Sequence, residues 1–396
     1  MTHRPQREAQ FPLGASVTVA ELEQDPHPVL RRLRAAEPVS WLPALDGWLV
    51  TRADLAAQVL RGPGAFTVDH PRFTTARVVG PSMLSLDGTA HRHHRDPFDR
   101  PLRSGEPGAR LAAFAAAEAA RLVAALAPDG AAELRRGLAG ELAVGVMVEV
   151  LGLDVDRSQL LAWYDAIVAG VSALADTASG NTVPASAQTA FAELGDCVLA
   201  AIARGGHASL LGTAAGGLTD AEVVSNAAVL LFGGIETTEG MICNAVWYLL
   251  RDPAAVAAVT SDPALAEAVV EESLRLEPAA AVVDRYATAD IRLGGAQISE
   301  GDLVTVSLAG ANRDPALFTD PDRFDLRRPA VRRHLAFAVG PHFCLGAQLA
   351  RQEARAADTE LLARLPGLRL DPGRPSAPHG LVFRKPRSLH VRWETP

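Results

Sequence analysis

A single cysteine, Cys344, stands where a segment rich in glycine and proline passes into a predicted helix. Backbone N–H groups without partners and the positive end of the helix dipole favour a negative sulfur there and lower the pKa of the thiol. A thiolate at this position could be a nucleophile, a redox sensor or a metal ligand, and the structural alternative is a small buried hydrophobe. The position alone leaves these alternatives open.

A second unusual group of residues interrupts a helix that we expect to begin near Thr219 and to end before Pro253. Thr219 and Glu222 have the spacing of a capping box, and residues 229–232 are apolar on every side, as in a buried helix. Five residues that are unfavourable in such a place then follow, namely Gly233, Gly234, Glu236, Thr237 and Thr238. A breach of local rules inside a buried helix indicates a site, and a tolerated kink is the structural alternative.

Two further motifs consist of charged or titratable side chains that could take part in a site. Glu272 and Arg275 lie three residues apart, so a helix places both on one face, although most such pairs are solvated and contribute under about 1 kcal/mol. Residues 91–95 read His-Arg-His-His-Arg, which could be taken as a metal cluster. Because the interleaved arginines oppose a cation, we do not expect zinc there.

Together these segments resemble the cytochrome P450 family. The family's haem-binding loop reads FGxGxHxCxGxxLAR, and this chain matches it at Phe337, Gly340, His342, Cys344, Gly346, Leu349, Ala350 and Arg351. Ala338 stands where the family usually has the first glycine, so we expect the backbone there to avoid positive φ. The helix and the two charged motifs match in the right order and extend the resemblance over nearly the whole chain.

The resemblance implies a haem site built on the loop and the central helix. Cys344 would be the thiolate axial ligand of the iron of haem b, which favours O–O cleavage. Thr237 would hydrogen-bond the iron-bound dioxygen or its water, and Glu236 would relay protons towards it. Thr238 would be structural. Three further residues are expected to contact the haem, namely Gly234, Phe337 and Gly346.

The charged motifs acquire roles by the same resemblance. Glu272 and Arg275 would join Arg323, which follows Pro321 and Asp322, in bracing the cysteine loop and retaining the haem. The haem propionates would be bound by four cationic side chains, namely His91, Arg95, Arg285 and His342. His93 departs from the arginine that the family usually has in its HxRxR motif.

Substrate contacts are expected by family position from apolar residues, with simple core packing as the alternative. They are Leu230, Gly233, Val282, Val283, Leu381 and Val382. Their chemistry favours an apolar or aromatic substrate near the iron.

The elements that must position these residues are mostly helical. Residues 107–270 are rich in alanine and leucine at helical spacing, broken at 128–130, 180–181 and 205–206. Hairpins are predicted at 39–51 and 291–298, a strand at 303–306, and a last helix from Cys344 to Leu365 before Pro366. We therefore predict a mainly α chain with a minor β part, one domain over residues 1–396, and by resemblance the triangular P450 fold with small β-sheets around a buried haem.

Composition excludes several classes of function. The 396 residues are 48% hydrophobic and 21% charged with a net charge of −8, and the scattered arginines form no basic stripe, so no nucleic-acid partner is expected. Lys385 is the only lysine. The three cysteines lie far apart without CxxC spacing, which fits a reducing compartment. With no signal peptide and no uncharged apolar run of about 18 residues, we expect a cytoplasmic protein without a membrane anchor.

The resulting hypothesis is a haem-thiolate monooxygenase that inserts one oxygen atom of O2 into a small, largely apolar substrate. No dinucleotide fingerprint is present, so electrons are expected from a separate ferredoxin and ferredoxin reductase, and the family favours a monomer. Arg351 and Arg355 could take part in docking them, with helix-face salt bridges as the alternative. The alternative functions are O-dealkylation of small aromatic ethers, another specialised P450 oxidation, and a catalytically silent haem-binding protein. Peroxygenases commonly lack the acid and alcohol pair that Glu236 and Thr237 provide here.

Overall fold

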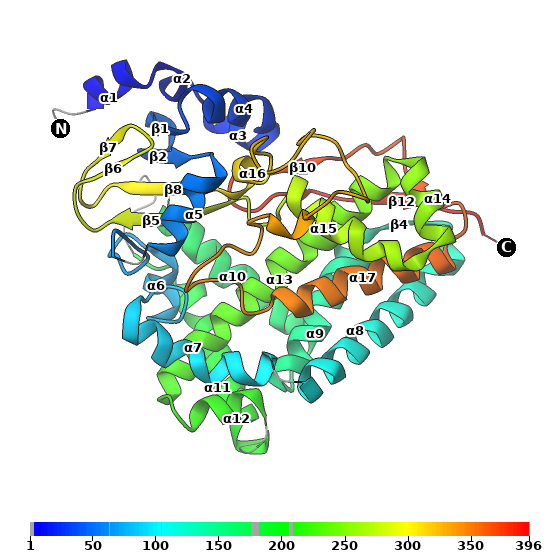
Figure 1. Ribbon diagram of the computed structural model, residues 1–396. Helices are drawn as coiled ribbons and strands as arrows, with labels where there is room; N and C mark the ends of the chain where they lie inside the picture. The colour runs from blue at the N-terminus through cyan, green and yellow to red at the C-terminus, as the bar shows by residue number, and fades with distance from the viewer. Residues whose placement is uncertain (1–3, 63, 104, 176–181, 206–208, 396) are drawn as a thin grey trace.

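A long buried helix, α13 (Asp220–Leu250), runs through the middle of the molecule (Figure 1). It begins as the sequence predicts: the Thr219 side chain accepts a hydrogen bond from the backbone N–H of Glu222, and the Glu222 carboxylate accepts one from the N–H of Thr219 at 2.8 Å. It ends three residues before Pro253, which cannot continue a helix. Most of its side chains are buried, so the remaining elements pack on it from several sides.

The computed structural model describes residues 4–62, 64–103, 105–175, 182–205 and 209–395. The helices before α13 are α1 (Arg4–Gln10), α2 (Pro12–Ala15), α3 (Val19–Gln24), α4 (His27–Ala36), α5 (Ala53–Arg61), α6 (Thr74–Val79), α7 (Gly88–Arg103), α8 (Gly105–Leu126), α9 (Glu141–Leu151), α10 (Arg157–Ala175), α11 (Ala185–Gly205) and α12 (Leu210–Ala215). Those after it are α14 (Pro253–Ser261), α15 (Ala266–Leu276), α16 (Leu308–Ala311) and α17 (Ala347–Arg364). A π-helical segment, η3 (Arg135–Gly140), precedes α9.

The predicted helical middle is confirmed. Its first break is real, because Gly130 has a positive φ of 70° and is followed by the short strand β4 (Ala131–Glu133). The second predicted break, at residues 180–181, lies outside the described residues, and so does Gly206 of the third. Around α13, α8 packs along α17, and α10 packs along α11.

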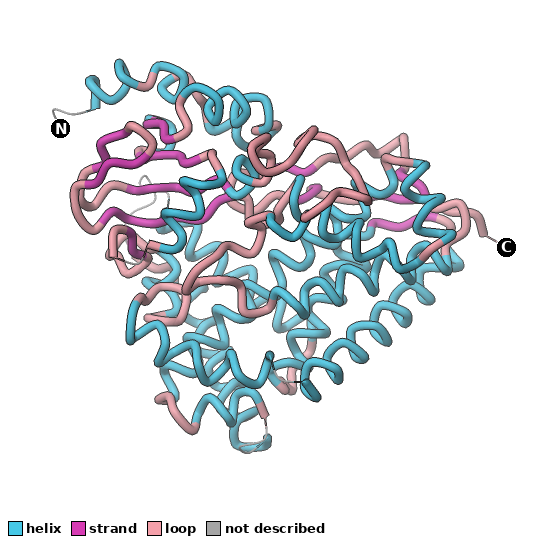
Figure 2. The backbone as a smooth tube through the Cα atoms, viewed as in Figure 1, coloured by secondary structure: helices cyan, strands magenta, loops and turns pink. Residues whose placement is uncertain are grey.

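The described strands form four small sheets, and Figure 2 shows them in two groups, one near the N-terminus and one near the C-terminus. The largest sheet has the order β1-β2-β8-β5-β3, with β1 (Val39–Leu42), β2 (Gly47–Val50), β3 (Phe66–Thr67), β5 (Val282–Ala287) and β8 (Leu303–Ser307). The others join β6 (Ile291–Leu293) to β7 (Ala296–Ile298), β10 (Pro378–His379) to β11 (Lys385–Pro386), and β4 (Ala131–Glu133) to β12 (His390–Arg392) and β9 (Arg369–Leu370).

Both predicted hairpins are confirmed. β1 pairs with β2 antiparallel so that Trp41 lies opposite Trp48, and β6 pairs with β7. β2 then pairs parallel with β8, which aligns Trp48 with Val304 and joins the early hairpin to the late strands. These segments are far apart in sequence, and their pairing brings β5 beside them in one sheet.

Glu277, just after α15, joins the two ends of the chain. Its buried carboxylate lies 2.6 Å from Arg384 Nε and 2.9 Å from His27 Nε2. Arg384 also donates to the backbone carbonyls of Leu22 and Glu23. The N-terminal helices and the C-terminal segment are therefore held at one buried anion.

One stretch of the described chain, Gly108–Asp129, is long and apolar enough by length and composition to cross a membrane. A third of its most apolar window is buried in the structure, and α8, which forms most of it, packs against α9 and α17. The stretch is therefore accounted for as a packed amphipathic helix.

Candidate active site

The cysteine segment forms a tight loop in front of α17. The N–H of Cys344 donates to the carbonyl of Phe337 at 3.0 Å, and the N–H of Phe343 donates to that of Gly340 at 3.1 Å. Gly340 has a φ of 83°, and a Cβ there would lie 2.6 Å from the carbonyl oxygen of Leu60. Only glycine fits this position, as the motif requires.

The expectation for Ala338 was wrong. Its φ is 56°, so the loop keeps its left-handed turn without the usual glycine. The N–H of Ala338 donates to the carbonyl of Leu335 at 2.8 Å, which closes the turn. Loop closure therefore outweighs the local cost of this conformation, which is about 1–2 kcal/mol for a residue with a Cβ.

Cys344 itself lies three residues before α17, which begins at Ala347 and not at the cysteine as predicted. The residue as a whole is exposed, although the protein atoms around the sulfur still desolvate the thiol. Burial raises the pKa of the Cys344 thiol, whereas the backbone N–H of Gly346 and the charges of Arg95 and Arg351 act to lower it. The predicted lowering was therefore wrong, because burial outweighs the donors; a thiolate here needs a bound cation to stabilise it.

Arg351 braces the loop from α17. Its guanidinium lies 4.4 Å from the centre of the Phe337 ring and forms an ion pair with Glu271. His334 Nε2 also contacts that carboxylate at 3.0 Å. Arg351 thus takes the salt-bridge role that was the alternative to docking, whereas Arg355 is exposed.

The predicted brace of three charged residues exists with one correction. Arg275 forms a two-fold contact with the buried Glu272 at 2.7 and 2.8 Å, but the second cation on Glu272 is Arg328, at 2.8 Å, and not Arg323. Arg323 contributes only its backbone carbonyl, which accepts from Arg275 and Arg328, while its side chain is exposed. The turn that follows Pro321 places Arg328 over the acid.

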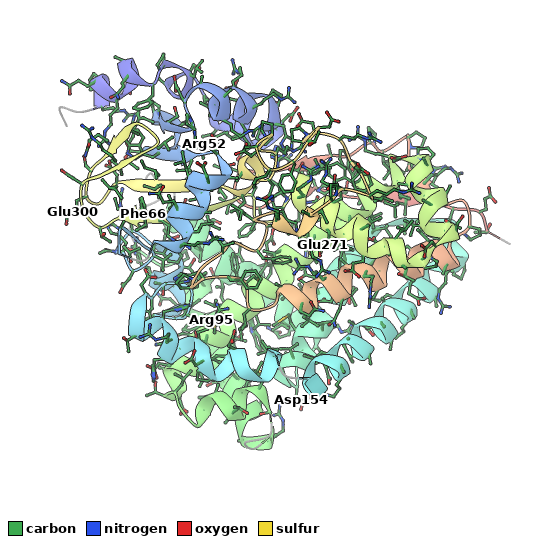
Figure 3. All side chains as sticks on the ribbon, in the orientation of Figure 1. Arg52, Phe66, Arg95, Asp154, Glu271 and Glu300 are labelled. Carbon is green, nitrogen blue, oxygen red and sulfur yellow. The ribbon has the colours of Figure 1, made fainter. Side chains whose placement is uncertain are left out.

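Four predicted cationic side chains gather beside the loop. The His91 and His342 rings are 4.3 Å apart, and Arg95, labelled in Figure 3, donates from α7 to the carbonyl of Phe343 at 2.6 Å. His342 Nε2 lies 2.9 Å from Asp87, just before α7. Arg285 on β5 is buried, and the charge of the Asp87 carboxylate favours the charged form of its guanidinium.

These groups are suited to an anion. Burial and the nearby His342 and Arg95 lower the pKa of His91 to about 4, so its ring is neutral at pH 7. Its buried Nε2 has no hydrogen-bond partner among the described residues. Burial lowers the pKa of Arg285, whose guanidinium donates to the carbonyl of Asp284 at 2.7 Å. A buried carboxylate would satisfy both groups.

The middle of α13 is open on one side. Gly233 is exposed, and a Cβ there would meet no described atom within 4 Å, whereas a Cβ on Gly234 would lie 2.2 Å from Met147 Sδ. Gly234 therefore serves the packing of α9 on α13, and the glycine at the open face is Gly233. The Thr237 hydroxyl donates to the carbonyl of Gly233 at 2.5 Å.

Glu236 lies in a different environment from Thr237. Its carboxylate is 2.7 Å from Lys385 Nζ on β11 and accepts a hydrogen bond from the Tyr164 hydroxyl on α10. Burial alone would raise the pKa of Glu236, but Lys385 and Tyr164 hold it below its ordinary value. The described contacts include no hydrogen bond between Glu236 and Thr237.

The histidine segment brings together one possible metal-binding group, His93, His94 and Glu222, whose ligand atoms lie within 4.8 Å of one another. Asn226 argues against a metal, because its amide oxygen accepts from the N–H of Met83 and its amide nitrogen donates to His94 Nδ1 at 2.9 Å. His94 must then carry its proton on Nε2, which faces Glu222. The predicted absence of zinc agrees with this tautomer.

Comparison with known proteins decides what kind of site this is. The Cytochrome P450 family model matches residues 207–366. Cytochrome P450 monooxygenase PikC from Streptomyces venezuelae is 35% identical over 93% of this chain and 91% of its own length. The chain is a cytochrome P450.

Further relatives support the same conclusion. Nocardicin C N-oxygenase from Nocardia uniformis subsp. tsuyamanensis is 34% identical over 97% of this P450 and 98% of its own length. The P450 heme domain of Tepidiphilus thermophilus has a TM-score of 0.86 at 26% identity, covering 96% of this chain and 97% of that one. The predicted family, fold class and enzyme class are confirmed: this is an oxidoreductase of the P450 monooxygenase family.

The residues present fit the thiolate-ligated haem that the family implies. The unpartnered Nε2 of His91 and the buried Arg285 suit the carboxylates at a haem edge, and Cys344 is a lone thiol between them and α17. The open face at Gly233 offers room on α13 that a side chain would fill.

The six predicted substrate residues divide into two groups. Leu230 and Gly233 lie on α13, and Val382 is 45% exposed. Val282 and Leu381, by contrast, line a small hollow with residues of α3 and α4, so they pack against the N-terminal helices. Val283 packs on the core of the main sheet. These contacts are the core packing that was the alternative for Val282, Val283 and Leu381, and their contact with a substrate stays a prediction.

Three residues of the site escaped the sequence reasoning. Arg328 and Tyr164 carry no local signal, because their partners lie 56 and 72 residues away in the chain. Lys385 had one signal, since it is the only lysine, but its two carboxylate partners could not be read from its neighbours.

Proposed function

We propose that this P450 is a haem-thiolate monooxygenase that inserts one oxygen atom of O2 into a small, largely apolar organic substrate in the cytoplasm. The observation that carries the proposal is the free thiol of Cys344 beside two histidines and two arginines, His91, His342, Arg95 and Arg285, which are suited to haem carboxylates. The named relatives are a monooxygenase and an N-oxygenase, which agrees with this reaction class.

When bound, the haem supplies the redox chemistry that activates oxygen and oxidises the substrate. Cys344 would ligate its iron, and Gly346 would hold the sulfur through its backbone N–H. His91, Arg95, Arg285 and His342 would bind the propionates, and Phe337, fixed under Arg351, would support the cysteine side. Glu272, Arg275 and Arg328 would hold the loop from behind.

Proton delivery is assigned to Glu236 and Thr237. Thr237 presents a hydroxyl at the open face of α13, where it would orient a water or accept and pass a proton at Oγ1. Glu236 lies one residue earlier and reaches towards Lys385, so its carboxylate would collect protons from that side.

Substrate would approach the open face of α13, where Leu230, Gly233 and Val382 offer apolar surface. Electrons would come from separate proteins, a ferredoxin and its reductase. Arg355, exposed on α17 after the cysteine loop, is a candidate for docking them.

The first test is the absorption spectrum of the reduced protein under carbon monoxide. We expect the Soret position typical of thiolate-ligated haem, its loss in Cys344→Ser, and its retention in the control Cys197→Ser, since Cys197 lies on α11. A histidine-type or absent carbon monoxide spectrum in fresh wild-type protein would refute the proposal.

The second test addresses oxygen activation. Thr237→Ala is expected to lower the product formed per electron pair by several-fold and to release peroxide instead, because the Oγ1 hydroxyl is lost from the open face of α13. Product and peroxide are measured together against NADH consumed with the redox partners. Thr238→Ala, which alters a buried side chain, should leave this ratio unchanged; equal ratios in wild type and Thr237→Ala would remove the role of Thr237.

A further inference from the structure

The only lysine of the chain bridges two acids of α13. Lys385 Nζ lies 2.7 Å from a carboxylate oxygen of Glu236 and 2.7 Å from one of Glu239. Its side chain is 11% exposed, and those of the two acids are 18% and 1% exposed. Removing the buried ammonium or one of its carboxylate partners would leave a buried charge without its partner, which is strongly destabilising.

The two acids differ in what else neutralises them. Glu239 has two arginines of η3 in direct contact, Arg135 at 2.7 Å and Arg136 at 3.3 Å. Glu236 has Lys385 as its direct cationic contact among the described residues, together with the neutral hydroxyl of Tyr164, whose pKa is raised by burial and by Glu236. Arg135 acts on Glu236 from a greater distance. Loss of Lys385 would therefore leave Glu239 paired and Glu236 buried without a contacting cation.

The pairing and packing of β11 bring Lys385 close to α13. β11 pairs with β10 so that Lys385 lies opposite His379, and the strand packs on α13 one turn after Glu236. A Cβ on Gly240 would lie 3.5 Å from Lys385 Cβ and 3.0 Å from Ala279 Cβ. Glycine at 240 thus permits the approach that lets a side chain from the C-terminal segment reach the acids.

We propose that Lys385 is a positioning residue that fixes the Glu236 carboxylate between β11 and α10 and thereby sets the pH range over which Glu236 passes protons. The inference rests on the proposed function of Glu236 and adds the residue that controls it. Glu236 is held as a carboxylate by Lys385 and Tyr164, and no described hydrogen bond joins it to Thr237. Passage of a proton from Glu236 to Thr237 therefore requires the contact with Lys385 to open.

The test compares Lys385→Gln with Lys385→Arg and with Arg136→Gln, whose side chain is 47% exposed and contacts Glu239 rather than Glu236. Product per electron pair is measured against pH in each haem-loaded protein. In Lys385→Gln the inflection of this profile is expected to move to higher pH by about one unit or more, as for an acid that loses a contacting cation. Lys385→Arg and Arg136→Gln should follow the wild type.

A second readout uses the single lysine. Protein grown on [15N]lysine should give one side-chain ammonium signal by NMR, and we expect it to shift in Glu236→Gln. If the pH profile of folded, haem-loaded Lys385→Gln superimposes on the wild-type profile, the proposal is wrong. If the wild type binds haem but does not turn over, the proposed function fails instead, and the lysine signal decides alone: a shift in Glu236→Gln supports the contact, and an unchanged signal overturns it.

Discussion

Arg328 shows how a motif can identify a site and still mislead about one residue. The spacing of Glu272 and Arg275 fixes two partners of the brace within one helical turn, and both are where the sequence predicts. The third partner depends on the turn between Pro321 and Arg328, which sequence spacing does not determine. Arg328 donates to Glu272 and to the carbonyls of Thr319 and Arg323, so one side chain holds the whole turn.

The two arginines can be separated by substitution. Arg328→Gln is expected to lower the free energy of unfolding by about 3–5 kcal/mol, because it leaves a buried carboxylate short of a cation and removes the donor to the carbonyls of Thr319 and Asp320. Arg323→Gln should change it by less than about 0.5 kcal/mol, since that side chain is exposed. Denaturant unfolding followed by circular dichroism measures both, and a larger loss in Arg323→Gln would restore the original assignment.

At the scale of elements, α13 is the part of the fold that the sequence determines most completely. Its capping box, its apolar middle and the proline after its end are local signals, and the helix has the predicted limits. The sequence did not show that its two neighbouring glycines have different structural roles. Gly233 and Gly234 are neighbours, but successive residues of a helix point about 100° apart, so one meets open space and the other meets α9.

Alanine at each glycine tests this division. Gly233→Ala should keep or raise stability by up to about 1 kcal/mol, because alanine favours the helix and its Cβ meets nothing described within 4 Å. Gly234→Ala should lower stability by about 1–3 kcal/mol, since its Cβ must displace Met147. Thermal unfolding ranks the two variants, and a larger loss in Gly233→Ala would contradict the open face.

Substrate titration separates the glycines in the opposite direction. Only Gly233→Ala should weaken the spectral response to a bound substrate, because only its methyl group enters the open face.

For the whole molecule, family resemblance predicted the architecture, and local patterns predicted its hairpins and helical middle. The contacts that close the fold were beyond reach, since Glu277 meets Arg384 across 107 residues and His27 across 250. Such pairs depend on how sheets and helices are stacked. The same limit applies to Lys385, which lies 146 residues from Glu239.

Glu277 gives the molecule a specific weakness to acid. Burial would raise the pKa of Glu277, but His27, Arg384 and Arg313 hold it far below its ordinary value. Its contribution to stability is therefore complete above the pKa of an unfolded glutamate, about 4.3, and is lost as pH falls further towards the folded pKa. Glu277→Gln should cost about 3–5 kcal/mol at pH 7, and less as pH falls below about 4.

Unfolding free energies of the wild type and Glu277→Gln, taken over a series of pH values, measure this difference. Glu360→Gln, which breaks a partly exposed pair with Arg364, is the control and should cost less than about 1 kcal/mol at every pH. A difference between wild type and Glu277→Gln that stays constant from pH 7 to pH 3 would contradict the account.

The contacts around the buried Glu277 carboxylate also bear on the order in which parts of the chain can fold during synthesis. Residues 22–27 leave the ribosome long before Arg384, whose guanidinium donates to the carbonyls of Leu22 and Glu23. All three residues of the brace, Glu272, Arg275 and Arg328, are synthesised before Arg384. The contacts between residues 22–27 and Arg384 can therefore form only after about 350 further residues have been synthesised, and until then the apolar faces of α3 and α4 lack the C-terminal segment that packs beside them.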